Sequence, residues 1–569
     1  MIQLPDTSAG FAGATWETLA SFYREMDAAP LDAATLEAWL ARWSRLDELV
    51  TEAASLAMIA YTSDTASAAK KAAHLRFSTE VLPQLEAAEV ALAKRFVAVG
   101  TDRPELQTTL KRFRCAIAIF REANVPLVSE AEGLAAQYQQ ITGSMTAGWG
   151  GERVPLPRLS PFLKSHDRAV RESAWRAANL PYLSARDALS ALFDRMVQLR
   201  QTMARNADFA DYRDYVFAAK CRFDYTPEDC TQLQGAIEQK VVPAMLRALE
   251  HRRQRLGLAQ LRPWDLAVDP WRATSPVPYH NVAELQETAA RIFSAVSPDL
   301  GGQFRTMMAE GLLDLESRPG KAPGGYCDTL HARGRPFVFM NAAGVAEDVT
   351  TLLHEAGHCF HAFASHARPL IWQRHPGAES AELASMSMEL LASPHLARPT
   401  GYYSDADALS TRLEHLEDTL ISLAHIASVD AFQNWIYTDP AGGDGAARDR
   451  AWLALRERFE PGVDWSGLTE ERTARWYRQL HIFLYPFYYI EYAIAQIGAL
   501  QVWRNARRDP AGAVAAYRRF LALGATRPLP ELYREAGVEM SFDAGLIGDL
   551  VAMVEEEMAE LRGLLHEVD

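Results

Sequence analysis

Helical periodicity is the feature that most limits the possible folds of this 569-residue chain. Residues 31–56 place leucine, alanine and tryptophan at steps of three and four, with charged residues between them. This spacing is typical of amphipathic helices that bury one face. Similar segments recur near residues 64–98, 104–122, 127–141, 167–204, 227–257 and 281–298. We find no repeat of fixed length, so we expect a mainly α protein rather than a regular solenoid.

Residues 143–158 depart from the helical pattern. They carry Gly150 and Gly151 between two short alternating stretches, which is typical of a β-hairpin. A phosphate-binding loop is the weaker interpretation, because no Gly-Lys-Ser/Thr sequence follows the glycines.

Residues 318–344 form the second departure and predict a pair of strands bounded by glycines. The stretch 336–340 (PFVFM) is β-prone, and Pro336 suits the start of an edge strand because it has no N–H to donate. The pattern then becomes helical again, with Glu347 and Asp348 placed for the positively polarised start of a helix.

Length and composition allow either three or four compact units or one large helical body, at about 150 residues per domain. A loose hinge is indicated near residues 190–225, although no sharp linker marks it. We therefore predict an N-terminal helical domain over residues 1–190, with the hairpin near 143–158, and a catalytic domain over residues 191–569.

Charge and cysteine usage narrow the class of protein. The formal charge of −15 disfavours nucleic acid as a partner, because binding phosphates requires a cationic surface. Five scattered cysteines without a CxxC pair argue against a disulfide framework and favour a reducing compartment. Neither a secretory leader nor an apolar run of about 18 residues is recognisable. We expect a cytoplasmic protein that does not bind membranes.

The segment HEAGHCFH at residues 354–361 carries the strongest chemical signal. On a helix, His354 and His358 lie about 40° apart on one face and one turn apart, so both imidazoles can bind one metal ion. Glu355 lies beside them, where it can take a proton from water at the metal. Zinc bound in this way still needs a third protein ligand.

Candidates for the third ligand lie close in the sequence. His361 is nearly two turns from His354, or about 10 Å along the helix, which is too far for one tetrahedral site. A predicted helix over residues 377–392 carries Glu379, Glu382 and Glu389 among Ala, Ser, Met and Leu. Because buried carboxylates require a cation or a metal, we expect one of these glutamates to be a ligand, and their spacing leaves the choice open.

A later segment, residues 481–492, gathers one histidine and four tyrosines. They are His481, Tyr485, Tyr488, Tyr489 and Tyr492. Such side chains can donate hydrogen bonds to the oxyanion that forms when water attacks a peptide carbonyl. If a helix begins near Pro486, Tyr485, Tyr489 and Tyr492 share one stripe. Ordinary aromatic core packing is the alternative.

Other nucleophiles and histidines carry weaker signals. The chain has no GxSxG, no GxGxxG after a strand and no phosphate-binding loop. Cys359 lies on the motif helix but has no evident base, so we interpret it as a packing residue. His280, His395 and His425 have no partner pattern and are interpreted as structural or surface residues.

HEAGHCFH resembles the HExGHxxH helix of the M3 metallopeptidases, the thimet oligopeptidase and oligoendopeptidase F group. ELASMSME is similar to the Glu-x-x-Ser-x-x-x-Glu segment of that family. Upstream, GGY, PFVFMNAAG and DVTTLLHE resemble the oligoendopeptidase F branch. The resemblance implies two helical halves flanking a deep substrate channel, with a small β-sheet next to the zinc helix.

The resemblance also implies roles for individual residues. One Zn²⁺ per chain would be held by His354, His358 and Glu382, with Glu355 as the base. Glu389 would orient a ligating histidine, and His361 would lie in the shell around the ligands.

The family's Tyr-x-x-x-Tyr-x-x-Tyr spacing matches the later cluster. His481 precedes its first tyrosine by four residues here, whereas the thimet branch uses five. The implied catalytic residues are His481, Tyr485 and Tyr492. Tyr488 and Tyr489 would bind substrate.

The expected function is zinc-dependent endopeptidase action on short peptides, with residues 336–340 pairing as an edge strand with the substrate backbone. One alternative is a carboxypeptidase or dipeptidase that grips the terminal carboxylate through Arg333, Arg335 or Arg478. A second is a non-catalytic, helical peptide-binding protein with a structural metal. The intact Glu355 argues against that alternative, because a structural site needs no base.

Overall fold

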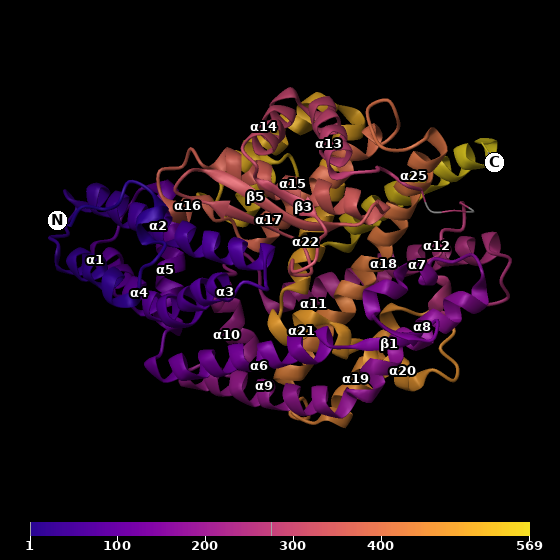
Figure 1. Cartoon of the computed structure of the whole chain (residues 1–569), viewed down its shortest axis with the longest axis horizontal. Coiled ribbons are helices and arrows are strands. Elements are labelled where there is room, and N and C mark those ends of the chain that lie inside the picture. Colours follow the sequence, from indigo (N-terminus) through magenta and orange to yellow (C-terminus); the bar gives the residue numbers. More distant parts are fainter. Residues whose placement is uncertain (1, 273, 275, 569) are drawn as a thin grey trace.

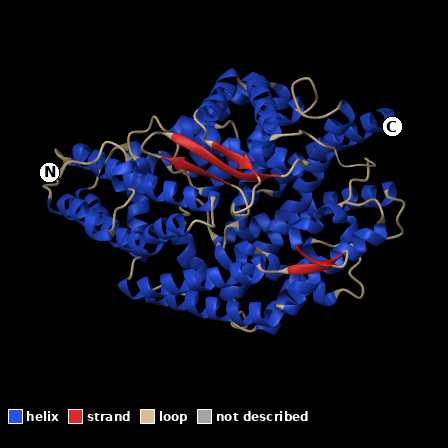
Figure 2. Cartoon of the chain, in the orientation of Figure 1, coloured by secondary structure: helices blue, strands red, loops and turns tan. Residues whose placement is uncertain are grey.

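The computed structural model describes residues 2–272, 274 and 276–568. Helices dominate it, with two small sheets between them, which confirms the expected mainly α architecture (Figure 2). Among the described residues, no helix combines the length and the apolar character needed to cross a bilayer.

The helices follow the predicted segments closely in the first half of the chain. Their bounds are α1 (Trp16–Ala28), α2 (Leu36–Ser63), α3 (Ala68–Leu75), α4 (Leu82–Val99), α5 (Gln107–Ile119), α6 (Val125–Gly143), α7 (Ser160–Leu163), α8 (Arg168–Ser184), α9 (Arg186–Asn206), α10 (Tyr212–Ala219), α11 (Pro227–Ala236) and α12 (Val242–Arg255).

The second half contains the remaining helices. They are α13 (Val282–Val296), α14 (Pro298–Ala309), α15 (Ala346–Ser365), α16 (Ile371–Arg374), α17 (Ala378–Ala392), α18 (Asp405–Thr438), α19 (Gly445–Phe459), α20 (Thr469–Ala474), α21 (Leu480–Leu484), α22 (Tyr489–Arg508), α23 (Pro510–Leu523), α24 (Leu529–Glu535) and α25 (Ala544–Val568).

An aromatic cluster centred on Trp43 holds the N-terminal helices α1–α5 together at one end of the molecule (Figure 1). Trp43 is fully buried, and its ring lies 5.3 Å from that of Trp39 and 5.0 Å from that of Phe113. Trp372 of α16 completes the cluster at 4.4 Å. The N-terminal helices are therefore packed directly on the segment that joins α15 to α17.

A second core joins residues from distant parts of the chain, between positions 134 and 216 and between 429 and 487. Residue 190, where we predicted a domain boundary, falls inside α9. Leu189 and Leu192, on either side of it, are both buried in this core. The division into residues 1–190 and 191–569 stays a prediction.

The predicted hairpin near residues 143–158 is confirmed. Strands β1 (Thr146–Trp149) and β2 (Glu152–Pro155) pair antiparallel across a two-residue turn. Gly150 and Gly151 both have positive φ angles, 60° and 86°, which the mirror-image turns of tight hairpins require and which glycine adopts without strain.

A second sheet lies beside α15 and has the order β3–β5–β4, from β3 (Leu313–Glu316), β4 (Tyr326–Leu330) and β5 (Arg335–Ala342). The prediction that residues 336–340 form an edge strand is wrong, because β5 is the central strand. Strand β3 was not predicted from the sequence, and it pairs parallel to β5 from Val338 onward. Pro336 is tolerated because it lies before this pairing begins.

The segment after β5 leads into α15, the helix that carries the histidine motif. A carboxylate oxygen of Asp348 accepts the backbone N–H groups of Gly344 and Val345 at 2.8 and 3.0 Å, as expected for an acidic residue at a helix start. Further along α15, Gly357 lets α17 pass at close range, since a Cβ there would lie 2.5 Å from the Cα of Ser385.

Candidate metal centre

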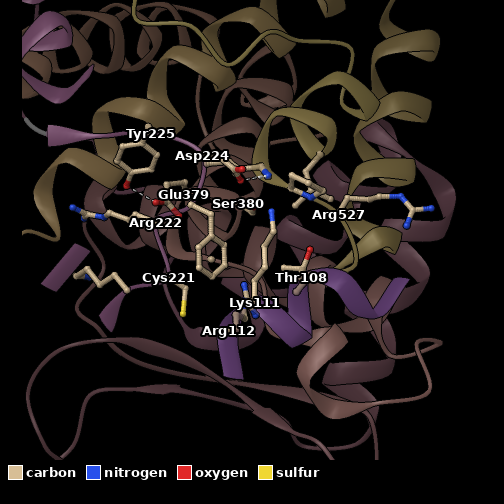
Figure 3. A pocket seen from close by; sticks show the side chains of 17 residues that line it. Thr108, Lys111, Arg112, Cys221, Arg222, Asp224, Tyr225, Glu379, Ser380 and Arg527 are labelled. Carbon is tan, nitrogen blue, oxygen red and sulfur yellow. Dashed lines mark hydrogen bonds between the residues drawn. The ribbon is translucent and has the colours of Figure 1, made fainter. Parts of the chain in front are cut away.

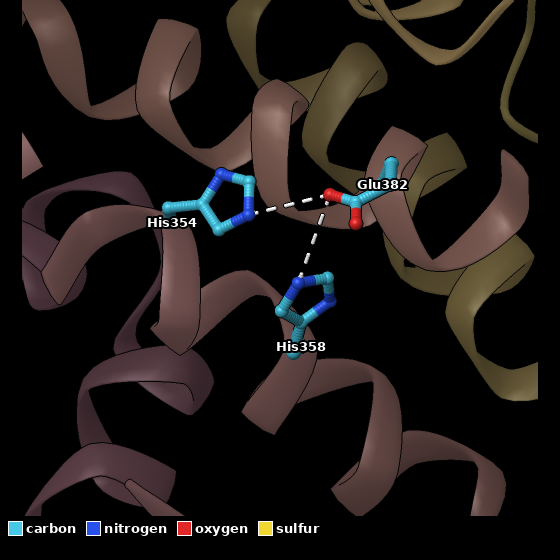
Figure 4. A group of neighbouring side chains, drawn as sticks. All are labelled: His354, His358 and Glu382. Atoms are coloured by element: carbon cyan, nitrogen blue, oxygen red, sulfur yellow. Dashed lines mark ion pairs between the residues drawn. The ribbon is translucent and has the colours of Figure 1, made fainter. Parts of the chain in front are cut away.

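His354 and His358 of α15 converge with Glu382 of α17 (Figure 4). The Nε2 atoms of the two histidines lie 3.3 and 3.8 Å from Oε2 of Glu382. Tetrahedral zinc with bonds of about 2.0–2.1 Å would place its donors roughly 3.4 Å apart. The three side chains therefore match the donor set and the spacing of a zinc site.

Glu382 is the member of this group that most requires a cation. It is only 4% exposed, and no lysine or arginine is paired with it in the described part of the chain. Burial by itself would raise its pKa, but hydrogen bonding and attraction from the two histidines lower that pKa to about 2. Glu382 is therefore available as an ionised ligand at neutral pH.

The two histidines differ in their surroundings. Burial favours the neutral form of His354, but the carboxylates of Glu382 and Glu389 raise its pKa well above the usual value. For His358 burial prevails and lowers the pKa to about 4. A metal ion would replace the proton that the two carboxylates stabilise on His354, because only neutral imidazole donates a lone pair.

Glu389 lies behind His354, on the side away from Glu382. Its Oε1 is 2.7 Å from Nδ1 of His354, so it can hold that ring in the tautomer that directs the Nε2 lone pair to the metal position. The other carboxylate oxygen of Glu389, Oε2, lies 3.7 Å from Nδ1 of His415 on α18. His415 was not predicted from the sequence, because no spacing pattern links it to the motif.

Glu355 is half-buried next to the ligands. Burial is the largest cause that raises its pKa, to about 7. A carboxylate with a pKa near neutrality can both accept and return a proton, and this is the property that a general base requires.

His481 lies at the centre of the predicted aromatic cluster. Its ring centroid is between 5.0 and 6.0 Å from those of all four tyrosines, which are Tyr485, Tyr488, Tyr489 and Tyr492. Burial lowers the pKa of His481 to about 4, so the imidazole is neutral at pH 7. The structure thus brings together every residue that the sequence singled out in this segment.

Tyr488 connects this cluster to the candidate metal ligands. Its hydroxyl donates to Oε1 of Glu382 at 2.9 Å, which fixes the carboxylate with its other oxygen toward the histidines. The hydroxyl of Tyr489 instead accepts a hydrogen bond from Gln479, whose side chain also contacts His425. His425, interpreted from the sequence as structural or surface, therefore lies directly behind the cluster.

The expectation that a helix begins near Pro486 is wrong. Helix α22 begins at Tyr489, because Phe487 has a positive φ of 61° that no helix accommodates. Phe487 is buried, and its N–H donates to Gln433 at 3.1 Å, which holds the turn. Tyr485 consequently lies outside the helix, is 54% exposed, and does not share a stripe with Tyr489 and Tyr492.

The remaining candidates, His361 and Glu379, do not belong to the group that His354, His358 and Glu382 form. His361 is buried against Phe520, and neither ring nitrogen has a hydrogen-bond partner among the described residues. Glu379 accepts a hydrogen bond from Tyr225. Glu379 lies one turn before Glu382 on α17, and of the two it is Glu382 that joins the histidines, as the family resemblance implies.

The arginines considered for gripping a substrate carboxylate have partners of their own. Arg333 is paired with Glu52 at 3.0 Å, and Arg335 with Glu310 at 2.8 Å. Arg478 donates to the side chain of Asn179 at 3.2 Å.

Comparison with known proteins agrees with this geometry. Residues 162–551 match the model of peptidase family M3. An oligoendopeptidase F homolog of Lactococcus lactis subsp. lactis is 22% identical over 423 residues, which cover 72% of this chain and 66% of that protein. Oligopeptidase PepF of Bacillus subtilis is 23% identical, covering 72% of this chain and 59% of the relative. The matched region thus spans less than two thirds of each of these two relatives.

Solved structures are similar over almost the whole chain. PZ peptidase A, solved with an inhibitor, has a TM-score of 0.87 and 26% identity, and the match covers 98% of each chain. A crystal structure described as a candidate oligoendopeptidase F has a TM-score of 0.88 and 27% identity, covering 96% of this chain and 97% of the other.

Proposed function

Because the chain belongs to peptidase family M3, we propose that it is a zinc-dependent oligoendopeptidase that hydrolyses internal bonds of short peptides. The observation that carries the proposal is the convergence of His354 and His358 with Glu382 from a second helix, beside a half-buried Glu355. We also propose that the enzyme acts in the cytoplasm, without nucleic acid or a membrane as partner.

Zinc bound to the three ligands would lower the pKa of water and polarise a peptide carbonyl. The protein's own contribution begins with Glu355, which takes the proton of the attacking water and passes it to the leaving amine. Its pKa of about 7 in the structure supports both steps. The carboxylate of Glu389 meanwhile keeps His354 in the orientation and tautomer that ligation requires.

The oxyanion that develops on the carbonyl needs hydrogen-bond donors. We assign this role to His481 and to tyrosines of the cluster around it. His481 is neutral at pH 7 and can donate from one ring nitrogen. Tyr492 is the tyrosine we favour, because Tyr488 and Tyr489 are engaged with Glu382 and Gln479 and Tyr485 lies in an exposed turn. Tyr485 remains a candidate for contacting substrate as it enters.

Two observations favour this function over the alternatives. Arg333 and Arg335 are already paired with carboxylates, so neither is free to hold the terminus that a carboxypeptidase would grip. Glu355 has no hydrogen bond among the described contacts, and a purely structural metal site would have no use for a half-buried acid at that position.

Replacing Glu355 with glutamine tests the mechanism. The variant should keep its zinc, because Glu355 is not a ligand, and should lose turnover by several orders of magnitude, because glutamine cannot accept the proton. Turnover would be measured with a fluorogenic peptide blocked at both ends, and metal content by elemental analysis before and after chelation. Cleavage of a doubly blocked peptide separates endopeptidase action from exopeptidase action.

Glu347→Gln provides a matched control on the same helix. Glu347 is exposed at the start of α15 and paired with Lys164, so the same chemical change there should alter neither zinc content nor turnover. Unchanged hydrolysis in Glu355→Gln would refute the mechanism, and loss of zinc from that variant would show that Glu355 is a ligand instead.

A further inference from the structure

A pocket rich in cations lies between α5, the segment after α10, and α17 (Figure 3). Five basic side chains contribute to its lining. They are Lys111, Arg112, Lys220, Arg222 and Arg527. We call this cavity the basic pocket. The chain has a formal charge of −15, so its overall charge repels anions. A cluster of basic side chains in such a chain therefore marks a local site for an anion.

The two acidic residues that line the basic pocket are hydrogen-bonded to neutral donors. Asp224 accepts the backbone N–H of Leu529 at 2.8 Å, and Glu379 accepts the hydroxyl of Tyr225 at 2.5 Å. Within the described part of the chain neither carboxylate lies at ion-pair distance from a basic residue of the lining, although Glu379 attracts Arg112 and Arg222 from farther away. Lys220 and Arg222 are paired with Glu491, and Arg527 lies 3.8 Å from Glu531, and neither of these glutamates lines the pocket.

Two of the cations have no carboxylate partner among the described residues. Lys111 lies over the ring of Phe223, with its Nζ 5.8 Å from the centroid, and Arg112 donates to the backbone carbonyl of His375. Burial lowers the pKa of Arg112, and the attraction of Cys221 and Glu379 offsets this effect only in part, so the cation has incomplete compensation. An anion in the basic pocket would supply that compensation.

A buried donor without a partner also lines the basic pocket. Ser380 is fully buried, and its hydroxyl has no hydrogen-bond partner in the described structure. Buried Arg222 is paired with Glu491 through Nη2, but its Nε and Nη1 likewise have no partner there. Unpaired buried donors are costly, so their presence around a cavity indicates that something polar completes the site.

The size of the basic pocket limits what can bind. It offers about 50 Å³ to the centres of water-sized molecules. One water needs about 10–15 Å³ on this measure, so the space suits a few atoms rather than a peptide or a nucleotide. We propose that the basic pocket binds a small oxyanion, a carboxylate or phosphate group, through Lys111, Arg112 and the hydroxyl of Ser380.

The basic pocket lies close to the metal centre. Lys220 lies over the ring of Tyr488 at 4.7 Å, and Tyr488 donates to the metal ligand Glu382. The oxyanion could be a free anion or the terminal carboxylate of a peptide, since both present the same chemistry to the basic pocket. Binding does not depend on the peptidase activity proposed above, and only the peptide source rests on it.

Calorimetric titration of the zinc-loaded protein with inorganic phosphate tests the site. Lys111→Ala and Ser380→Ala should each weaken phosphate binding by on the order of tenfold, because each removes a hydrogen bond to a charged ligand. Lys71→Ala is the control, since it removes one exposed lysine charge on α3, outside the lining of the basic pocket, and should leave the affinity unchanged. Ser380→Ala removes only an unpartnered hydroxyl, so folding is preserved.

Absence of phosphate binding, equal affinity in all variants, or an equal loss in Lys71→Ala would each overturn the proposal. Kinetic assays with peptides that have either a free or an amidated C-terminus identify the source of the oxyanion. If the peptide supplies it, Lys111→Ala raises KM for the free acid only, and phosphate competes with that peptide. If a free anion supplies it, both peptides respond alike. The calorimetric result stands even if the protein hydrolyses neither peptide.

Discussion

Changing Glu389 tests whether the metal centre depends on the carboxylate behind His354. In the structure Glu389 Oε1 lies 2.7 Å from Nδ1 of His354, while Nε2 of the same ring faces Glu382. Glutamine at position 389 keeps an oxygen that can accept the Nδ1 proton but removes the negative charge. Alanine removes both. We therefore expect a graded loss of zinc affinity, larger for alanine than for glutamine.

The magnitude follows from the kind of contact that is lost. Outer-shell partners of metal-binding histidines typically contribute a factor of about 10–100 in affinity. Because the bond is short and the carboxylate is largely buried, we assign about tenfold to Glu389→Gln and about 100-fold to Glu389→Ala. These factors correspond to about 1.4 and 2.7 kcal/mol.

Competition with a chromogenic chelator at constant pH measures these affinities. Glu379→Gln is the matched control, because Glu379 is a buried glutamate of the same helix that bonds Tyr225 rather than a histidine. Its zinc affinity should stay within about twofold of the unchanged protein. The reasoning is refuted if both Glu389 variants also stay within twofold, or if Glu379→Gln loses as much affinity as they do.

Three further changes test the surroundings of the site. Gly357→Ala should destabilise the protein by about 1–3 kcal/mol in urea unfolding, because the new Cβ would meet the backbone of α17. The control is Gly133→Ala, which has open space around it and should stabilise the protein by up to about 1 kcal/mol. Tyr488→Phe should weaken zinc binding by about tenfold in the chelator assay, since Glu382 loses a donor; unchanged affinity would contradict this role. Burial raises the pKa of Asp430 to about 6, so the folded protein binds a proton on this carboxyl more tightly than the unfolded chain does. The protein therefore loses stability as the pH rises from about 4 to about 6. Asp430→Asn should therefore be more stable by about 3 kcal/mol at pH 8 and by about half that at pH 5; an equal difference at both pH values would disprove the assignment.

The helix that carries the candidate metal ligands was predictable because the placement of its histidines depends on local spacing. His354 and His358 share a face whenever residues 354–358 are helical, whatever the rest of the chain does. The hairpin turn was predictable for the same reason, since Gly150 and Gly151 supply the positive φ angles that it needs. The choice of Glu382 over Glu379 came from the family resemblance and not from spacing, and the structure places Glu382 beside the histidines.

Features that depend on contacts between distant segments were not predictable. Strand β3 is only four residues long and pairs in parallel with β5, which lies well after it in the sequence, so no local pattern predicts it. The late start of α22 depends on Phe487, whose backbone is held by Gln433 from another helix. His415 reaches Glu389 only because α18 packs beside α17, which no spacing rule encodes.

The contact between Trp43 and Trp372 ties the N-terminal helices to the rest of the chain, so the chain cannot be shortened there without loss of packing. The family match begins at residue 162, well after α1–α5, which suggests a fragment that could be cut free. Such a fragment would expose Leu370 and Trp372, which the N-terminal helices now cover on the link between the two ligand-bearing helices. Helices α1–α5, which end at Ile119, therefore hold that link in place, and a protein without them should aggregate or lose the alignment of its candidate metal ligands.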